Sequence, residues 1–291
     1  MSRQAVTVRP PVLVEGREAL DHLVGLLRSE PAVAIDSESN SFHAYRERVC
    51  LLQISTRGGD WVVDPLAVDV RPLGEVLCDG RETVLHGADY DVRCLYREYG
   101  WRFPRLFDTM VAARRLGAPA LGLSALVEAH FGVRLSKAHQ RSDWGRRPLT
   151  REQLTYAAFD THYLLQLRDR LVGEMEARGL EAAARAEFAR IAGAEPRERV
   201  FDPEGWRRIR GARDLDPAGA AVLRALYLAR EERARALDRP PFKVLAEATL
   251  VELARRRPGS PAALRAVPGV TESVLRRMGD AIASALRDAA G

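Results

Sequence analysis

The sequence lacks any apolar run long enough to span a membrane, and residues 1–15 contain no hydrophobic segment of secretory length. A chain of 291 residues, of which 46% are hydrophobic and 29% charged, can bury a core and form one or two domains. We therefore expect a globular cytoplasmic protein with no membrane partner.

Cysteine is scarce, and its spacing excludes the usual thiolate sites. The chain has three cysteines, Cys50, Cys78 and Cys94, an odd number without the CxxC spacing of zinc or redox motifs. All three lie in segments patterned as core. We expect buried, reduced thiols and no metal site built from thiolates.

Lysine is also scarce, because Lys137 and Lys243 are the only two lysines among 45 basic residues. Residues 196–291 carry 19 Lys and Arg against 13 Asp and Glu, a net charge of +6, which leaves −1 for residues 1–195. A basic C-terminal third suits a polyanion such as a nucleic acid. The abundance of Arg and Ala equally fits a biased genome composition, so charge alone leaves the partner open.

Hydrophobic periodicity predicts strands early in the chain and helices later. Residues 32–38, 49–56 and 61–64 have strand patterns, with a Gly-containing turn at 57–60, which predicts an antiparallel meander. A strand at 83–87, a helix from Asp91 to Gly100, a strand at 105–109 and helices at 110–116 and 124–131 follow. This order predicts an α/β fold with a mixed sheet flanked by helices.

The remainder of the chain is patterned as helix. A helix is expected to begin at Thr150, and helices are predicted at 218–237, 245–256, 262–267 and 272–286. Prolines, glycines and charges crowd residues 194–216 and interrupt any long periodicity. We therefore expect one domain over residues 1–195, a linker over 196–211 and a small all-helical domain over 212–291.

Two carboxylates inside a predicted strand are the main chemical signal. Asp36 and Glu38 are two residues apart, so both side chains leave the same face while the apolar neighbours enter the core. Like charges this close repel unless a cation neutralises them. With aspartates from two later segments they would form an oxygen-rich site for hard divalent cations, although an isolated Asp-x-Glu pair is more often a solvated strand edge.

Several stretches together resemble the bacterial ribonuclease D group of DEDD exonucleases, over most of residues 20–175. They are Ala34-Ile-Asp-Ser-Glu38, Cys50-Leu-Leu-Gln-Ile-Ser55, His86-Gly-Ala-Asp-Tyr-Asp91, Leu106-Phe-Asp-Thr109, Gln140-Arg-Ser-Asp-Trp144 with Arg147-Pro-Leu149, and Tyr156-Ala-Ala-Phe-Asp-Thr-His-Tyr163.

The C-terminal region, from about residue 211 to 289, resembles an HRDC domain, the helicase-and-ribonuclease-D C-terminal module. The stretches that carry this resemblance are Asp238-Arg-Pro-Pro-Phe242, Leu253-Ala-Arg255 and Val267-Pro-Gly-Val270. The combination is more specific than either half, because HRDC domains also occur in helicases.

The resemblance implies a ribonuclease-H-like fold in which Asp36, Glu38, Asp91 and Asp160 bind two divalent metal ions, Mg²⁺ or Mn²⁺. Two such cations ~4 Å apart can activate the attacking water and stabilise the leaving 3′ oxygen. Asp91 rather than Asp89 corresponds to the third acidic residue of the family, because it stands five positions after His86.

The resemblance places the chain in the branch of the family that has a tyrosine before the last aspartate. Tyr156 is four residues before Asp160, so both lie on one face of the predicted helix. A tyrosine with a pKa near ~10 is a poor base at neutral pH. We expect Tyr156 to orient the attacking water by hydrogen bonding.

Six residues are candidates for binding substrate, each with a structural alternative. A lysine can meet a phosphate and an aromatic ring can stack on a base, although a tryptophan here can equally anchor the loop in the core. Asn40 and Gln53 can hydrogen-bond a nucleotide, or they can serve a core or turn role. His86 can pack in the core or hydrogen-bond to residues that surround the site. Asp108 can approach the same cleft or cap the helix that follows it, and the N-cap role is favoured. The six candidates are Asn40, Gln53, His86, Lys137, Gln140 and Trp144.

The function implied by the resemblance is that of a metal-dependent 3′-to-5′ exoribonuclease. It would trim structured RNA such as tRNA precursors from a free 3′ end and release nucleoside 5′-monophosphates, with the HRDC domain adding affinity. A DNA exonuclease of the same fold is an alternative, because no residue pattern identifies a 2′-OH reader. A non-catalytic nucleic-acid-binding protein is a second alternative. The oligomeric state is open, and a monomer is favoured.

Overall fold

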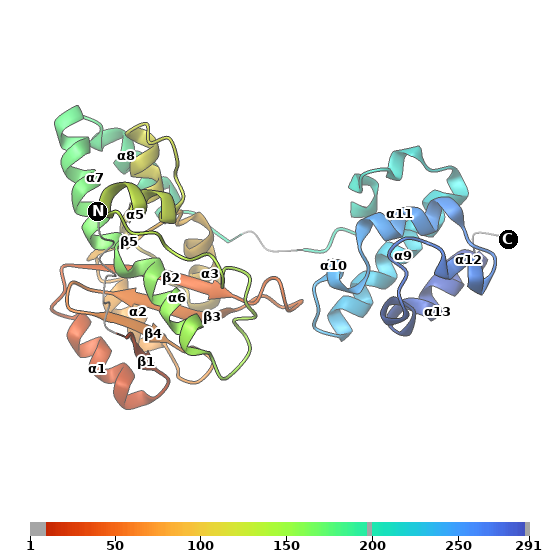
Figure 1. Ribbon diagram of the computed structural model, residues 1–291, viewed down its shortest axis with the longest axis horizontal. Coiled ribbons are helices and arrows are strands. Elements are labelled where there is room, and N and C mark those ends of the chain that lie inside the picture. The colour runs from red at the N-terminus through yellow and green to blue at the C-terminus, as the bar shows by residue number, and fades with distance from the viewer. Residues whose placement is uncertain (1–9, 197–199, 289–291) are drawn as a thin grey trace. The chain divides into compact units, whose positions relative to one another are not determined.

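The computed structural model describes residues 10–196 and 200–288, which form two compact units (Figure 1). Within the described residues, the first unit comprises 10–40 and 48–196, and the second comprises 41–47 and 200–288. Residues 197–199 of the predicted linker lie outside the described residues. In the described chain, no helix has both the length and the apolar character needed to cross a membrane.

A mixed six-stranded sheet with strand order β1-β4-β3-β2-β5-β6 forms the centre of the first unit. β2, β3 and β4 form an antiparallel meander, whereas β1 pairs with β4, β5 with β2, and β6 with β5 in parallel. The predicted mixed sheet is therefore confirmed. Its strands are β1 (Val12–Val14), β2 (Ala32–Ser39), β3 (Val49–Ser55), β4 (Asp60–Val63), β5 (Glu82–Leu85) and β6 (Arg105–Asp108).

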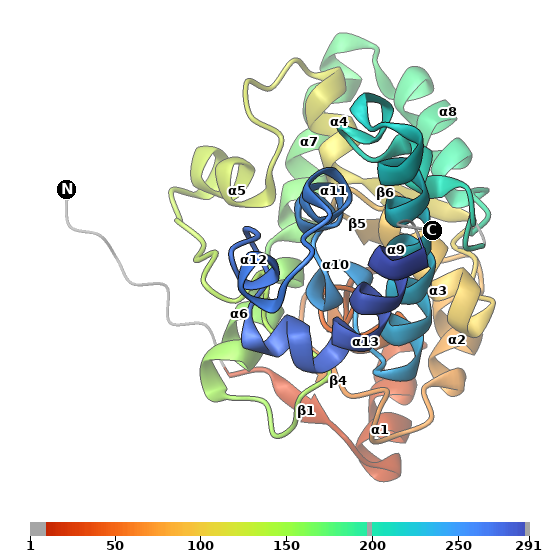
Figure 2. The same cartoon turned by 90° about the vertical axis from the view of Figure 1, so that its right-hand side faces the viewer.

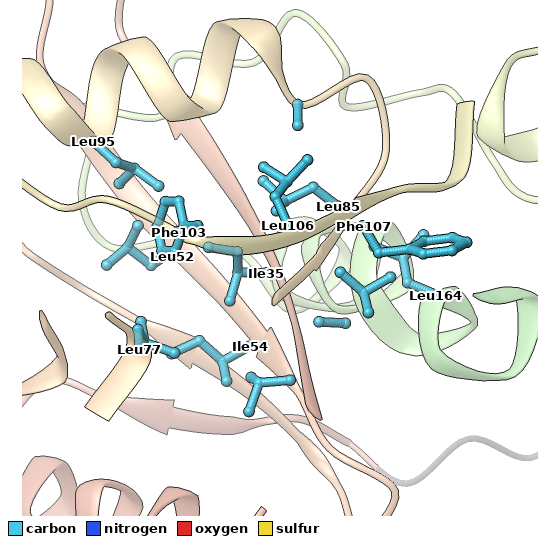
Figure 3. Close-up of a cluster of buried hydrophobic side chains, with 14 of the residues drawn as sticks. Ile35, Leu52, Ile54, Leu77, Leu85, Leu95, Phe103, Leu106, Phe107 and Leu164 are labelled. Carbon is cyan, nitrogen blue, oxygen red and sulfur yellow. The ribbon is translucent and has the colours of Figure 1, made fainter. Parts of the chain in front are cut away.

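The main hydrophobic core packs against the sheet (Figure 3). Ile35 on β2 pairs with Ile54 on β3, and because side chains alternate along strands both enter this core. Leu77 and Leu95 belong to the same cluster. The helices that contribute to it include α1 (Arg17–Leu27), α2 (Arg71–Leu77) and α3 (Asp89–Tyr99).

The strand residues of opposite parity, which include Asp36 and Glu38, point to the face that helix α6 (Arg151–His162) covers. α6 packs across β2, β3 and β4, and α7 (Leu164–Arg178) packs on β2 and β5. α8 (Glu181–Ala192) packs against β6 at the end of the sheet. The other two helices of the described part of this unit are α4 (Thr109–Arg115) and α5 (Leu123–Phe131).

Local sequence signals explain where the helices near the acidic residues begin and end. The Thr150 hydroxyl accepts the N–H of Gln153, whose side chain accepts the N–H of Thr150, which confirms the predicted start of α6. α3 ends at Gly100, whose φ of 72° is left-handed. Asp108 caps α4 by accepting two backbone N–H groups, so its N-cap role is confirmed.

The second unit is helical, as expected. Its longest helix, α9, packs beside both α11 and α13 (Figures 1 and 2). Its core contains Leu226, Leu250, Leu253 and Ile282, all fully buried. The helices are α9 (Pro217–Ala236), α10 (Pro241–Val244), α11 (Glu247–Arg256), α12 (Pro261–Arg265) and α13 (Glu272–Asp288), with short 3₁₀ turns at Gly205–Arg208 and Ala212–Asp214.

Residues 41–47, which connect β2 to β3, belong to this second unit. The Tyr45 hydroxyl donates to Glu231 at 2.5 Å, and Asp238 Oδ1 accepts the backbone N–H groups of Tyr45 and Arg46. The sequence pattern does not predict that this loop belongs to the second unit, because its partners Glu231 and Asp238 are nearly 200 residues away in the sequence.

The three cysteines are free thiols. Cys50 and Cys94 are buried as predicted, whereas Cys78 is partly exposed. Burial raises the pKa of Cys50 to about 11, so this thiol stays protonated at neutral pH. A thiolate metal ligand is not favoured there.

Candidate active site

Three carboxylates from two elements gather on the α6 face of the sheet. Asp36 and Glu38 project from the same face of β2, and Asp160 projects from α6, which packs over this strand. One oxygen from each lies within 4.8 Å of the others, and all three side chains are partly buried. The structure therefore brings together the first, second and fourth of the four predicted acidic residues.

Asp91 reaches the same region from the N-terminus of α3. Asp91 is 6% exposed, and its carboxylate accepts a 2.5 Å hydrogen bond from the Ser37 hydroxyl and acts electrostatically on Asp36. Asp89, two residues earlier, is instead exposed and forms an ion pair with Arg93. The structure thus places Asp91, not Asp89, beside the carboxylates of β2, outside the group of three described above.

The carboxyl groups have raised pKa values because they are buried and repel one another. Burial, followed by repulsion from Asp160 and Asp91, raises the pKa of Glu38 to about 9. The same causes raise the pKa of Asp160 to about 7 and that of Asp36 well above its usual range. Burial raises the pKa of Asp91 to about 6, although its Ser37 hydrogen bond opposes this.

The raised pKa values mean that the ionised carboxylates are destabilised, so a bound positive charge would stabilise them. In the protein alone, part of the cluster is protonated at neutral pH. A divalent cation would favour the ionised carboxylates, and an all-oxygen donor set suits hard ions such as Mg²⁺ and Mn²⁺. The donor chemistry therefore fits the divalent metal dependence of DEDD-type exonucleases.

The same shifts predict how stability depends on pH and metal. Because the carboxyl pKa values are higher in the folded than in the unfolded chain, the metal-free fold loses stability as pH rises through about 6 to 9. We expect the melting temperature in EDTA to fall by roughly 5 °C or more from pH 6 to pH 9. Mn²⁺ should reverse this fall, and its stabilising effect should grow with pH in thermal melts.

A Glu38→Gln variant is the matched control for this titration. It removes the carboxyl whose pKa is raised to about 9, so its melting temperature in EDTA should fall less as the pH rises. A wild-type protein that Mn²⁺ does not stabilise at pH 8 would contradict the assignment of a metal site.

Tyr156 lies one helical turn before Asp160 on α6 and is partly buried. Its ring stacks on Trp144 with centroids 6.0 Å apart and meets the edge of His139 at the same distance. Burial, followed by repulsion from Asp160, raises the pKa of the phenol. Tyr156 is therefore a neutral hydroxyl at any physiological pH and can donate a hydrogen bond.

A cavity of about 650 Å³ opens beside Tyr156. It lies between α6 and the segment that precedes it, and its volume is large enough for a nucleotide. Arg134 pairs with Glu128 at 2.7 Å, whereas Arg151 is an exposed residue at the start of α6. The residues that line the cavity include Arg134, His139, Arg151, Thr155, Tyr156 and Phe159.

Three predicted substrate-binding residues lie in the segment before α6, and they differ in burial. Lys137 and Gln140 are exposed, so both can meet a ligand from solvent. Trp144 is 1% exposed and packs with Leu51, Val62 and Ala157. With this burial, Trp144 presents no surface to a base, and the structure supports its alternative role as a loop anchor.

Asn40, His86 and Gln53 are buried or partly buried, and the first two have internal partners. Asn40 Oδ1 accepts the backbone N–H of Arg48 at 2.9 Å, which is the turn role. His86 Nδ1 lies 2.9 Å from the Thr109 hydroxyl, and burial lowers its pKa. Gln53 is 0% exposed, which disagrees with direct contact to a nucleotide.

Two polar contacts that the sequence pattern does not predict anchor the elements around the site. His162 Nδ1 lies 2.8 Å from Asp60, which also accepts the Ser55 hydroxyl, so α6 is tied to β3 and β4. Arg147 binds both oxygens of Asp64 just before α6. The two residues of each contact are far apart in the sequence. The one sequence feature that could indicate such a contact is a polar residue inside an apolar segment.

The sequence matches the profile of a family described as 3′-5′ exonuclease over residues 11–176 and that of the HRDC domain over residues 219–286. It is 36% identical to ribonuclease D from Pseudomonas paraeruginosa, in an alignment that covers 90% of this chain and 70% of that protein. It is 31% identical to the exosome complex exonuclease RRP6 from Saccharomyces cerevisiae, covering 96% of this chain but 40% of that protein.

Solved structures give the same picture. The catalytic core of RRP6 from Trypanosoma brucei superposes with a TM-score of 0.88 at 29% identity, covering 99% of this chain and 82% of that one. Escherichia coli RNase D, described as an exoribonuclease involved in structured RNA processing, superposes with a TM-score of 0.73 at 31% identity, covering 97% and 76%. Both similarities extend over nearly all of this chain.

Proposed function

Because this chain belongs to the ribonuclease D family of 3′-5′ exonucleases, we propose that it trims RNA from a free 3′ end and releases nucleoside 5′-monophosphates. The observation that carries the proposal is the cluster of Asp36, Glu38 and Asp160, with Asp91 beside it. Tyr156, one helical turn before Asp160, lines a nucleotide-sized cavity. Structured RNAs such as tRNA precursors are the proposed substrates.

RNA is favoured as the substrate by the relatives that share most of their length with this chain. The alignment covers 70% of the Pseudomonas paraeruginosa protein, which is named a ribonuclease. The alignment covers only 40% of the yeast RRP6 protein, so that relative carries less weight in the choice of substrate. The HRDC domain, a module shared with helicases, is proposed to add affinity for RNA.

In the proposed mechanism, Asp36, Glu38, Asp91 and Asp160 hold two divalent cations, Mg²⁺ or Mn²⁺. Bound there, these ions would supply Lewis-acid stabilisation of the charge that develops at the phosphate during in-line displacement. The protein contributes the geometry, since β2 fixes two carboxylates on one face and the Ser37 hydroxyl holds Asp91 in place.

Tyr156 is proposed to orient the attacking water, because its hydroxyl remains protonated and lies one turn from Asp160. The cavity beside it would receive the 3′-terminal nucleotide. Arg151 is available at this cavity to meet a phosphate, and Lys137 and Gln140 are exposed in the preceding segment. None of these contacts reads a base, which suits an enzyme that trims different sequences.

The direct test uses one RNA in two labelled forms and its DNA counterpart. A 3′-labelled RNA should release a labelled mononucleotide from the first turnover, and a 5′-labelled RNA should shorten progressively. An RNA blocked by a 3′-phosphate should be cut much more slowly. Faster degradation of DNA would favour the DNA exonuclease alternative, and a lack of nuclease activity with Mn²⁺ would favour a binding protein.

The oligomeric state and the cellular location are also proposals. We propose that the enzyme acts as a monomer in the cytoplasm. Light scattering during the activity assay would measure its mass in solution, and a stable dimer would overturn the first of these expectations.

A further inference from the structure

Gln53 lies in the middle of β3, between a carboxylate and an apolar side chain. The strand register pairs it with Asp36 on β2 and with Val62 on β4. Residues that face each other across an antiparallel pair share one face of the sheet, with Cβ atoms ~4.5–5.5 Å apart. The amide of Gln53 is therefore within reach of the Asp36 carboxylate.

Helix α6 closes this face over Gln53. Two residues along β3, the Ser55 hydroxyl lies 2.6 Å from the Thr161 hydroxyl, which fixes α6 above the strand. Ala157, one turn before Thr161, packs in a cluster with Leu51 and Val62. The surroundings of Gln53 are thus apolar on two sides, and Asp36 is the polar neighbour that the strand pairing supplies.

Neither the nitrogen nor the oxygen of the Gln53 amide has a hydrogen-bond partner among the described residues, although the side chain is 0% exposed. Buried polar groups are normally paired, and an unpaired one destabilises the fold. An apolar residue of similar size would pack at this position without that cost. The amide therefore needs a role that the protein alone does not satisfy.

We propose that Gln53 is a positioning residue for Asp36: its amide N–H group donates to the Asp36 carboxylate, directly or through one water, when the acidic cluster binds divalent cations. The inference rests on the metal-dependent function proposed above. The strand register places the unpaired Gln53 amide beside this side chain, and a hydrogen bond from an amide N–H to a metal-ligating carboxylate is charge-assisted. It would hold Asp36 in one orientation, as ligand-orienting partners do in other metal sites.

The test replaces Gln53 with Met, which keeps its length but cannot donate to a carboxylate. In EDTA, the melting temperature of Gln53→Met should equal or exceed that of the wild type, because an unpaired amide is removed. The concentration of Mn²⁺ that gives half-maximal thermal stabilisation should rise at least ~10-fold. In RNA cleavage at a fixed, subsaturating Mn²⁺ concentration, kcat should fall while KM for RNA stays unchanged.

Leu51→Met is the matched control, because Leu51 lies two residues away on the same face of β3 and is equally buried. It should leave the Mn²⁺ dependence unchanged. Gln53→Asn, whose amide is one methylene too short, provides a second soluble variant and should weaken Mn²⁺ binding as Gln53→Met does.

Wild-type Mn²⁺ dependence in either Gln53 variant would overturn the inference, and a lower melting temperature in EDTA with unchanged Mn²⁺ dependence would assign Gln53 to core packing. If Mn²⁺ does not stabilise even the wild-type protein, the proposed metal-dependent function fails as well. The wild-type melt therefore separates the two failures.

Discussion

Replacing Asp160 with Asn is expected to lower kcat for RNA hydrolysis by about 10³-fold or more, in line with losses at residues that stabilise transition-state charge. The substitution keeps the shape of the side chain but removes one negative charge from the cluster, which then holds divalent cations more weakly. In EDTA the variant should be as stable as the wild type or more so, because a repelling buried carboxyl is lost. RNA binding, measured by fluorescence anisotropy, should persist.

The third acidic residue offers a matched pair for the same experiment. Asp91→Asn should cause a loss of similar size, whereas Asp89→Asn should change kcat by less than ~3-fold, because Asp89 is an exposed partner of Arg93. A large loss in Asp89→Asn with an active Asp91→Asn would reverse the assignment. Full activity in Asp160→Asn would contradict the proposed site.

Replacing Tyr156 with Phe is expected to lower the single-turnover rate by roughly 10–100-fold, the scale of a misplaced reactant. The ring stacking on Trp144 is kept, so the loss reports on the hydroxyl. Because the pKa of Tyr156 is raised, its hydroxyl stays protonated, and the loss should be constant between pH 6 and pH 9. Single-turnover assays across this range would measure it.

Tyr163→Phe is the control for this change. The Tyr163 hydroxyl is buried and has no partner among the described residues, and its removal should leave the rate unchanged. A Tyr156→Phe enzyme with the wild-type rate would rule out a role in orienting the water. A loss confined to high pH would instead indicate that Tyr156 acts as a base.

Much of the first unit follows from local sequence. The alternation in β2 and β3 predicts the meander, and Thr150 with Gln153 predicts the start of α6, because these signals act over a few residues. The three-residue β1 is not predictable in this way, since its strand character comes from pairing with β4 about fifty residues later. The membership of residues 41–47 in the second unit is equally non-local.

The substrate-binding candidates show the same limit. Lys137 and Gln140 are polar and exposed, as their sequence context suggests. Trp144 and Gln53 carry side chains that suit a nucleotide, but both are buried under α6. Residue type alone does not reveal burial when the covering element comes from a distant part of the chain.

The sequence by itself determined the chemistry of the site. Strand periodicity places Asp36 and Glu38 on one face, helical periodicity places Tyr156 one turn from Asp160, and the motifs indicate the family. The tertiary structure decided what depends on distance and burial: the raised carboxyl pKa values, the burial of Asp91 beside Ser37, and the unpaired Gln53 beside Asp36. The physical reason is that periodicity is a local property, whereas repulsion and desolvation arise when distant segments meet.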